Sequence, residues 1–119
     1  MAISSLQIRA LVANELAGVS EPSVKAYIGS LLVEPQIVMR QWDYGEIGEV
    51  FPCWSVLNHS RSNTGIAYCE YGFGPKNPWG LVGLSGSDHK SMGMDCGWFP
   101  TFLEAFFDSA ASMWSDLQS

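Results

Sequence analysis

The side chains that could do catalytic or metal chemistry are few and widely spaced in this chain. Its histidines are His59 and His89, and its cysteines are Cys53, Cys69 and Cys96. Cys53 and His59 suggest a metal pair by residue type, but they lack spacings typical of zinc ligands, such as C-x2-C. We therefore expect no metal and no cofactor. Three cysteines without framework spacing fit free, buried thiols in a reducing compartment.

Two other motifs resemble catalytic sequences but lack the required context. Residues 83–87 (G-L-S-G-S) depart from the G-x-S-x-G elbow at the last position. Residues 72–74 (G-F-G) precede a proline, where a phosphate loop would need a backbone N–H. Catalysis by a Cys–His pair through Cys69 or Cys96 stays open, because such partners meet only in the fold. We expect a protein that is not an enzyme and has no catalytic residues.

Aromatic residues gather between residues 68 and 99 and permit two interpretations. They would line a ligand pocket or, as large apolar side chains more often do, fill the core and pair across strands. A pocket for a small ligand, served by His59, His89 or Cys96, is the alternative that we keep open. We expect the core role for Tyr68, Tyr71, Phe73, Trp79, Trp98 and Phe99.

One connection combines aromatic and acidic side chains between two apolar segments. Residues 42–49 read W-D-Y-G-E-I-G-E, with three carboxylates, two aromatic rings and two glycines. Aromatic side chains are common anchors of protein interfaces, and acidic side chains steer association with a basic surface. An ordinary solvated turn is the other interpretation. We predict that partner binding involves Trp42, Asp43, Tyr44, Glu46 and Glu49.

The net charge of −6 narrows the classes of partner. We expect no binding to nucleic acid, because Lys and Arg would have to neutralise its phosphates. A partner with a basic surface fits this charge, although the same charge also keeps a small protein soluble. No apolar run reaches membrane-spanning length, and the N-terminal segment lacks the pattern of a secretory signal. We expect a cytoplasmic protein.

The N-terminal part of the chain predicts two helices within a single domain of residues 1–119. The composition, 47% apolar and 15% charged, is typical of a compact chain. Ser4 or Ser5 would cap a first helix that ends at Gly18. A second helix would begin near Pro22 and end before Pro35. Apolar stripes at helical spacing comprise Ile8, Leu11, Val12 and Leu16, then Val24, Tyr27, Ile28, Leu31 and Leu32.

The rest of the chain predicts strands and a last helix. Residues 36–44, 50–59, 64–73 and 79–84 are rich in strand formers, and their short connections require an antiparallel meander. Residues 92–98 would add a short fifth strand or an irregular segment. Helices at both ends of such a sheet give the α+β class. After Pro100 a capping box, T-F-L-E, predicts a helix with the stripe Leu103, Phe106, Phe107, Ala110, Met113, Trp114 and Leu117.

Two segments of the C-terminal half carry a recognisable pattern. They are the strand pair I-A-Y-C-E-Y-G-F-G and W-G-L-V-G-L, and the stretch M-G-M-D-C-G-W-F-P-T-F-L-E-A-F. From Val50 to Trp114 the chain resembles small bacterial immunity proteins, which are encoded beside polymorphic or contact-dependent toxins. The resemblance implies a protein that binds and neutralises a toxin, often a nuclease with a basic cleft, and it assigns no binding residue. The alternatives are an acidic phage-type inhibitor of a nucleic-acid enzyme and a small-ligand binding protein or hydrolase.

Overall fold

The structure, a computed structural model, describes residues 4–41, 50–71, 74, 76–84, 97–109 and 112. Within these residues the chain forms three α-helices and a five-stranded antiparallel sheet. Two helices precede the sheet and one follows it, which confirms the α+β class. Predicted features at residues 42–49, 85–96 and 113–119 lie outside the described part of the chain.

The first helix, α1 (Ser5–Ala17), begins and ends where the sequence predicts. Ser4 caps it through a reciprocal pair of hydrogen bonds with Gln7, which satisfies two backbone donors at the helix start. Leu11, predicted to face the core, is instead 38% exposed. The buried face of α1 is therefore narrower than the predicted stripe, and its fully buried positions are Ile8 and Val12.

The second helix, α2 (Pro22–Leu31), carries its proline in the first turn, where the missing N–H removes no helical hydrogen bond. It ends before Pro35, as predicted. Leu32, predicted as the last member of the helical stripe, instead leaves the helix with an extended backbone and begins a strand. Ile28 is fully buried, and the partly buried side chains that pack beside it are Val24, Tyr27 and Leu31.

Two long strands follow, β1 (Leu32–Gln41) and β2 (Val50–His59), and they pair in an antiparallel hairpin. The bounds of β2 match the prediction, but β1 starts ahead of the predicted Gln36. Pro35 lies inside this strand because β1 is at the edge of the sheet, where a missing N–H costs no ladder bond. The register shifts around this proline, between Leu32 and Gln36.

The third and fourth strands are shorter than predicted, and the fifth is described only from Trp98 to Phe99. The third strand ends at Tyr68, whereas the prediction extended it to Phe73. Beyond Tyr68, the Cys69 N–H donates to the Pro78 carbonyl at 2.8 Å, and the chain then turns away from the strand. The three strands are β3 (Thr64–Tyr68), β4 (Trp79–Gly83) and β5 (Trp98–Phe99), and the sheet order is β1-β2-β3-β4-β5. Gly80 in β4 is required by packing, because a Cβ there would lie 2.3 Å from the Trp98 ring.

The last helix, α3 (Phe102–Asp108), is capped from two sides. Thr101 accepts a hydrogen bond from the Glu104 N–H at 3.1 Å, as the capping box predicts. The Glu15 carboxylate of α1 also accepts from the Phe102 and Leu103 N–H groups, each at 3.0 Å. These contacts join the first helix of the chain to the start of the last one.

The end of α3 differs from the prediction. The helix stops at Asp108, and Ser109 is extended, so no single helix runs to Leu117. Phe106 is fully buried, as predicted, but Phe107 is 52% exposed. The buried face also includes Phe102 and Ala105, which the predicted stripe omits. The predicted positions outside the described residues are Ala110, Met113, Trp114 and Leu117.

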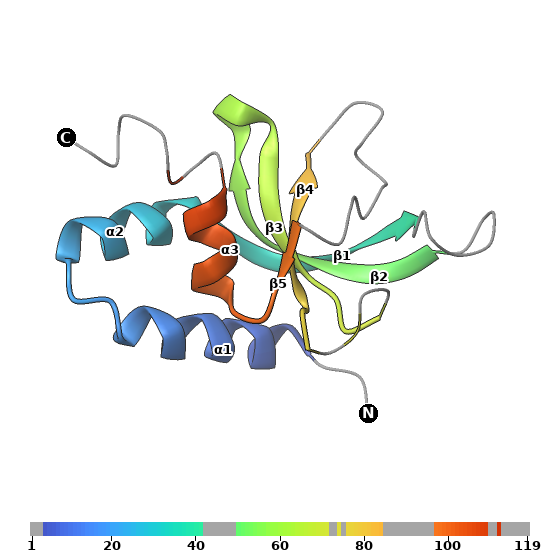
Figure 1. Cartoon of the computed structure of the whole chain (residues 1–119), viewed down its shortest axis with the longest axis horizontal. Helices are drawn as coiled ribbons and strands as arrows, with labels where there is room; N and C mark the ends of the chain where they lie inside the picture. The colour runs from blue at the N-terminus through green and yellow to red at the C-terminus, as the bar shows by residue number, and fades with distance from the viewer. Residues whose placement is uncertain are drawn as a thin grey trace.

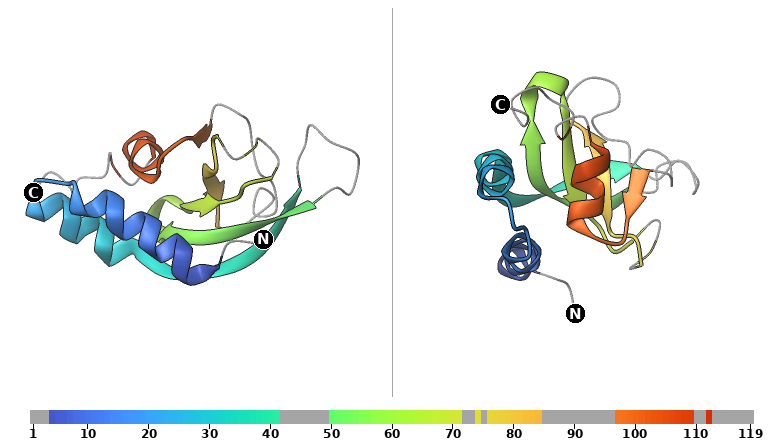
Figure 2. Two further views of the ribbon diagram at one scale, coloured as in Figure 1. Left: turned by 90° about the horizontal axis from the view of Figure 1, so that it is seen from below. Right: turned by 60° about the vertical axis from the view of Figure 1, so that its left-hand side comes forward.

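The helices cover only one end of the sheet. Figure 1 shows α1, α2 and α3 gathered around that end, whereas β1 and β2 extend past them on the opposite side. The views in Figure 2 show the same arrangement, with the hairpin projecting away from the helices. The main core lies between helices and sheet and contains Ile8, Val12, Ile28, Val56, Leu57, Ile66, Tyr68, Trp79, Phe102, Ala105 and Phe106.

A second, smaller core holds buried side chains from β2 to β5. Its members are Cys53, Ala67, Cys69, Val82 and Trp98. The predicted core role of the aromatic residues is confirmed for Tyr68, Trp79 and Trp98, and Phe99 packs partly buried against the main core. Tyr71 is 52% exposed, so the prediction is wrong there, and Phe73 lies outside the described residues.

Candidate functional site

The predicted binding residues Trp42, Asp43, Tyr44, Glu46 and Glu49 all lie outside the described residues. The structure does describe the two residues that flank this connection. Gln41 and Val50 pair directly across the β1–β2 hairpin. Gln41 and Val50 therefore mark the end of the hairpin that extends away from the helices (Figure 1).

Exposed apolar side chains concentrate near this end of the hairpin. The described chain exposes seven large hydrophobic residues, and four of them lie on the hairpin or in the segment beside it. We call these four residues the hairpin patch: Ile37 (52% exposed), Met39 (48%), Val50 (39%) and Tyr71 (52%). Contiguous apolar surface on a soluble protein is typical of interaction sites, whereas single exposed apolar residues are normal.

The register explains why these side chains are exposed. Ile37 pairs with Trp54, and Trp54 pairs with Tyr68 of the main core, so the three residues share one face of the sheet. Met39 is two residues beyond Ile37 on the same face. Ile37, Met39 and Val50 thus continue the core face of the sheet beyond the region that the helices cover, and Tyr71 lies in the segment that follows β3.

The surface contains a small hollow of about 80 Å³, and one of the residues that line it, Glu70, is acidic. The Tyr68 hydroxyl donates to the Glu70 carboxylate at 2.7 Å, and Glu70 is exposed to solvent. Burial, and then this hydrogen bond, raise the pKa of Tyr68. Tyr71 stacks on Phe51 with ring centroids 5.9 Å apart. The hollow is lined by Ile37, Pro52, Trp54, Tyr68, Cys69, Glu70 and Tyr71.

This arrangement suits a long basic side chain. Lys and Arg pack their aliphatic stems on apolar and aromatic surfaces while the charged end reaches a carboxylate. Here Trp54 and Tyr71 supply the aromatic surface, and Glu70 supplies the carboxylate. Glu70 and Ile37 are exposed here, but neither was predicted as a binding residue from the sequence. The alternation of residues along the strands indicates their shared face, but it does not show where the helices stop.

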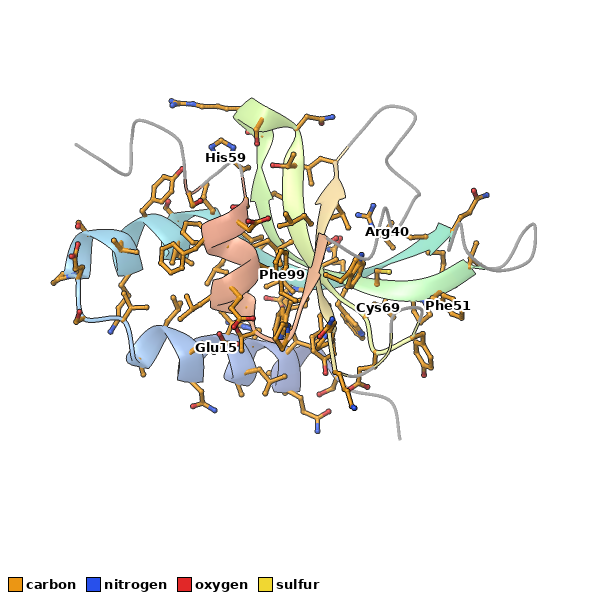
Figure 3. All side chains as sticks on the ribbon, viewed as in Figure 1. Glu15, Arg40, Phe51, His59, Cys69 and Phe99 are labelled. Carbon is orange, nitrogen blue, oxygen red and sulfur yellow. The ribbon has the colours of Figure 1, made fainter. Side chains whose placement is uncertain are left out.

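The two described thiols are buried side by side in the second core. Cys53 and Cys69 are free, and they are 0% and 1% exposed. A hydrogen bond to Cys69, and then burial, raise the pKa of Cys53. The same bond lowers the pKa of Cys69, because the Cys53 thiol donates to it, while burial acts in the opposite direction. Arg40 is also buried nearby, and it donates to the Gly83 carbonyl at 3.3 Å (Figure 3).

The histidine that the structure describes is distant from these thiols. His59 ends β2, six residues after Cys53, which separates the two by roughly 20 Å along an extended strand. They therefore do not form the metal pair that their types suggested. His59 is 3% exposed, and its Nδ1 lies 2.6 Å from the Ser62 hydroxyl. His89 and Cys96 lie outside the described residues.

No family model, curated protein or solved structure matches this chain. In the part of the chain that the structure describes, no helix is both long and apolar enough to cross a membrane. Within the same residues, no three His, Cys, Asp or Glu side chains lie close enough together to hold a metal ion.

Proposed function

We propose that this protein is an inhibitor of the immunity type, which binds and neutralises a cognate protein toxin with a basic surface. The observation that supports the proposal is the position of the hairpin patch. Four exposed apolar side chains lie at the base of a connection that carries three carboxylates in sequence. A surface with apolar anchors beside acidic groups is suited to a basic protein partner.

Each part of this surface has a different physical role. The apolar and aromatic side chains bury area in the complex, which slows dissociation. The carboxylates at positions 43, 46 and 49, together with Glu70, attract the basic partner and speed association. A Lys or Arg side chain of the partner in the hollow would contact the apolar side chains through its aliphatic stem and Glu70 through its charge.

The experiment starts by identifying the partner. The tagged protein is purified from its native cells, the bound protein is identified, and its toxic domain is produced separately for calorimetry. Changing Ile37 and Met39 together to Ser should weaken binding at least tenfold, because a few central apolar residues supply most interface energy. A toxin that binds the double variant as tightly as the original chain would refute the proposed surface.

A matched control is available on another surface. Phe107 is as exposed as Ile37, at 52%, but it lies on α3, away from the hairpin. Phe107→Ser should leave the affinity unchanged, because it removes a similar apolar side chain outside the hairpin patch. In cells that carry the toxin, growth should then be lost with the Ile37 and Met39 double variant and retained with Phe107→Ser.

A further inference from the structure

Cys53 and Cys69 lie directly opposite each other on neighbouring strands. In the antiparallel β2–β3 ladder, Trp54 of β2 pairs with Tyr68 of β3. Because the two strands run in opposite directions, the residue before Trp54 lies opposite the residue after Tyr68. These two residues are Cys53 and Cys69. Both side chains are buried in the second core, and both thiols are free.

The backbone of Cys69 identifies this as the closer type of cross-strand pair. Its N–H donates to the Pro78 carbonyl at 2.8 Å, on the side of β4, and therefore points away from β2. A residue whose backbone groups point away from the opposite strand forms a non-hydrogen-bonded pair, in which the Cα atoms lie about 4.5 Å apart. Disulfide bonds join cysteines whose Cα atoms lie about 4.4–6.8 Å apart. The spacing of the strands therefore already suits a bond between Cys53 and Cys69.

The two sulfur atoms already interact, and they differ in reactivity. The Cys53 thiol donates a hydrogen bond to the Cys69 sulfur, which lowers the pKa of Cys69. Burial acts in the opposite direction, and the Tyr71 backbone N–H, a second donor to this sulfur, lowers the pKa further. The thiolate is the form of cysteine that attacks oxidants. Cys69 is therefore the first sulfur to react, and Cys53 is the neighbouring thiol that completes a bond.

We propose that Cys53 and Cys69 form an oxidative modification site, at which hydrogen peroxide converts the two thiols into a cross-strand disulfide. The Cys69 thiolate attacks one peroxide oxygen, and the O–O bond breaks. The released hydroxide takes up a proton, which leaves a sulfenic acid on Cys69 and one water. The Cys53 sulfur then attacks the Cys69 sulfur, and the sulfenic hydroxyl leaves with the Cys53 proton as a second water. The two sulfur atoms together lose two electrons, which the peroxide gains.

The bond changes how firmly one segment is held. It closes a loop over residues 54–68, which restricts the unfolded chain and thereby stabilises the folded one. It also fastens to β2 the start of the segment that carries Glu70 and Tyr71. Because both thiols are buried, the oxidant must be small and uncharged, as hydrogen peroxide is. The modification site does not depend on the proposed function, and its test needs no partner.

The test is oxidation of the folded full chain with hydrogen peroxide, followed by tryptic digestion without reductant and mass spectrometry. Trypsin places Cys53 in residues 41–61, Cys69 in residues 62–76 and Cys96 in residues 91–119, so each possible disulfide has its own mass. We expect residues 41–61 linked to residues 62–76, and release of the two peptides by dithiothreitol. Cys96→Ser is the matched control, since it removes a thiol outside the pair, and it should form the same linked peptide.

Thermal unfolding gives a second readout. Oxidation should raise the unfolding midpoint of the original chain and of Cys96→Ser by roughly 10 °C, and dithiothreitol should reverse the rise. Reversal separates the disulfide from methionine oxidation, which dithiothreitol leaves in place. Cys69→Ala should show no reversible rise, and a rise of equal size in this variant would overturn the proposal.

The peptide map of the original chain decides the question even if Cys69→Ala does not fold. Failure to find the linked peptide, a link to residues 91–119 in its place, or a link that forms only in urea would each overturn the proposal.

Discussion

At the scale of single residues, Glu15 has the most specific structural role. Its carboxylate accepts two backbone hydrogen bonds at the start of α3, a position that also favours negative charge. Glu15→Ala should therefore lower the free energy of unfolding by about 1–2 kcal/mol, the range for losing a helix cap. Urea unfolding followed by circular dichroism measures this. Glu21, which caps α2 without a side-chain hydrogen bond, is the control, and an equal loss in Glu21→Ala would contradict the role.

Tyr68 should make stability depend on pH in the alkaline range. Its pKa is raised, so the folded chain keeps the phenol proton where the unfolded chain, with a pKa near 10, has lost it. The contribution of Tyr68 to the free energy of unfolding is fully present below about pH 10, and it is lost as the pH rises above that value. Urea unfolding between about pH 9 and 11 should show a shallower decline for Tyr68→Phe than for the original chain. Parallel declines would show that Tyr68 does not titrate differently on folding.

At the scale of secondary structure elements, α3 offers a direct test of core closure. Phe106 is fully buried and Asp108 is exposed on the same helix. Phe106→Ala should cost about 3–5 kcal/mol, as for other emptied aromatic core sites, whereas Asp108→Ala should change stability little. Thermal unfolding of both variants provides the comparison. Equal midpoints would mean that α3 does not close the core.

The element bounds were predictable where local chemistry sets them. Caps fixed the start of α1 at Ser4 and of α3 at Thr101, because capping is decided within one helical turn. The early start of β1 was missed, because a proline is acceptable in a strand only at a sheet edge. The position of a strand in its sheet is a property of the whole fold. The apolar stripe of the C-terminal segment predicted a longer helix, but α3 ends at Asp108.

At the scale of the whole molecule, charge should govern how fast a basic partner binds. The net charge of −6 attracts such a partner before contact. Salt screens this attraction beyond about 8 Å at physiological ionic strength. The association rate, measured by stopped flow with the proposed toxin, should fall steeply between low and high salt. Changing Asp43, Glu46 and Glu49 together to Ser should flatten that dependence. A rate that is insensitive to salt would argue against a basic partner.

The candidate site was only partly predictable from the sequence. The acidic connection of residues 42–49 stays a prediction from composition, because it combines carboxylates with aromatic rings and lies outside the described residues. The hairpin patch was not found, because Ile37 and Met39 have the spacing of any half-buried strand. Their exposure depends on how far three helices, contributed from both ends of the chain, reach along the sheet. The contact of Glu15 with α3 was equally hidden, since the two lie 87 residues apart.

The 87-residue separation of Glu15 and Phe102 affects how the protein folds while it is being synthesised. Translation delivers α1 and α2 first, yet the main core receives Phe102, Ala105 and Phe106 only when the last helix leaves the ribosome. Until then the apolar faces of the nascent helices and sheet have no cover, and contacts of such long range form slowly. The main core therefore cannot close before residues 102–106 have been synthesised, and during that interval its apolar faces are open to aggregation.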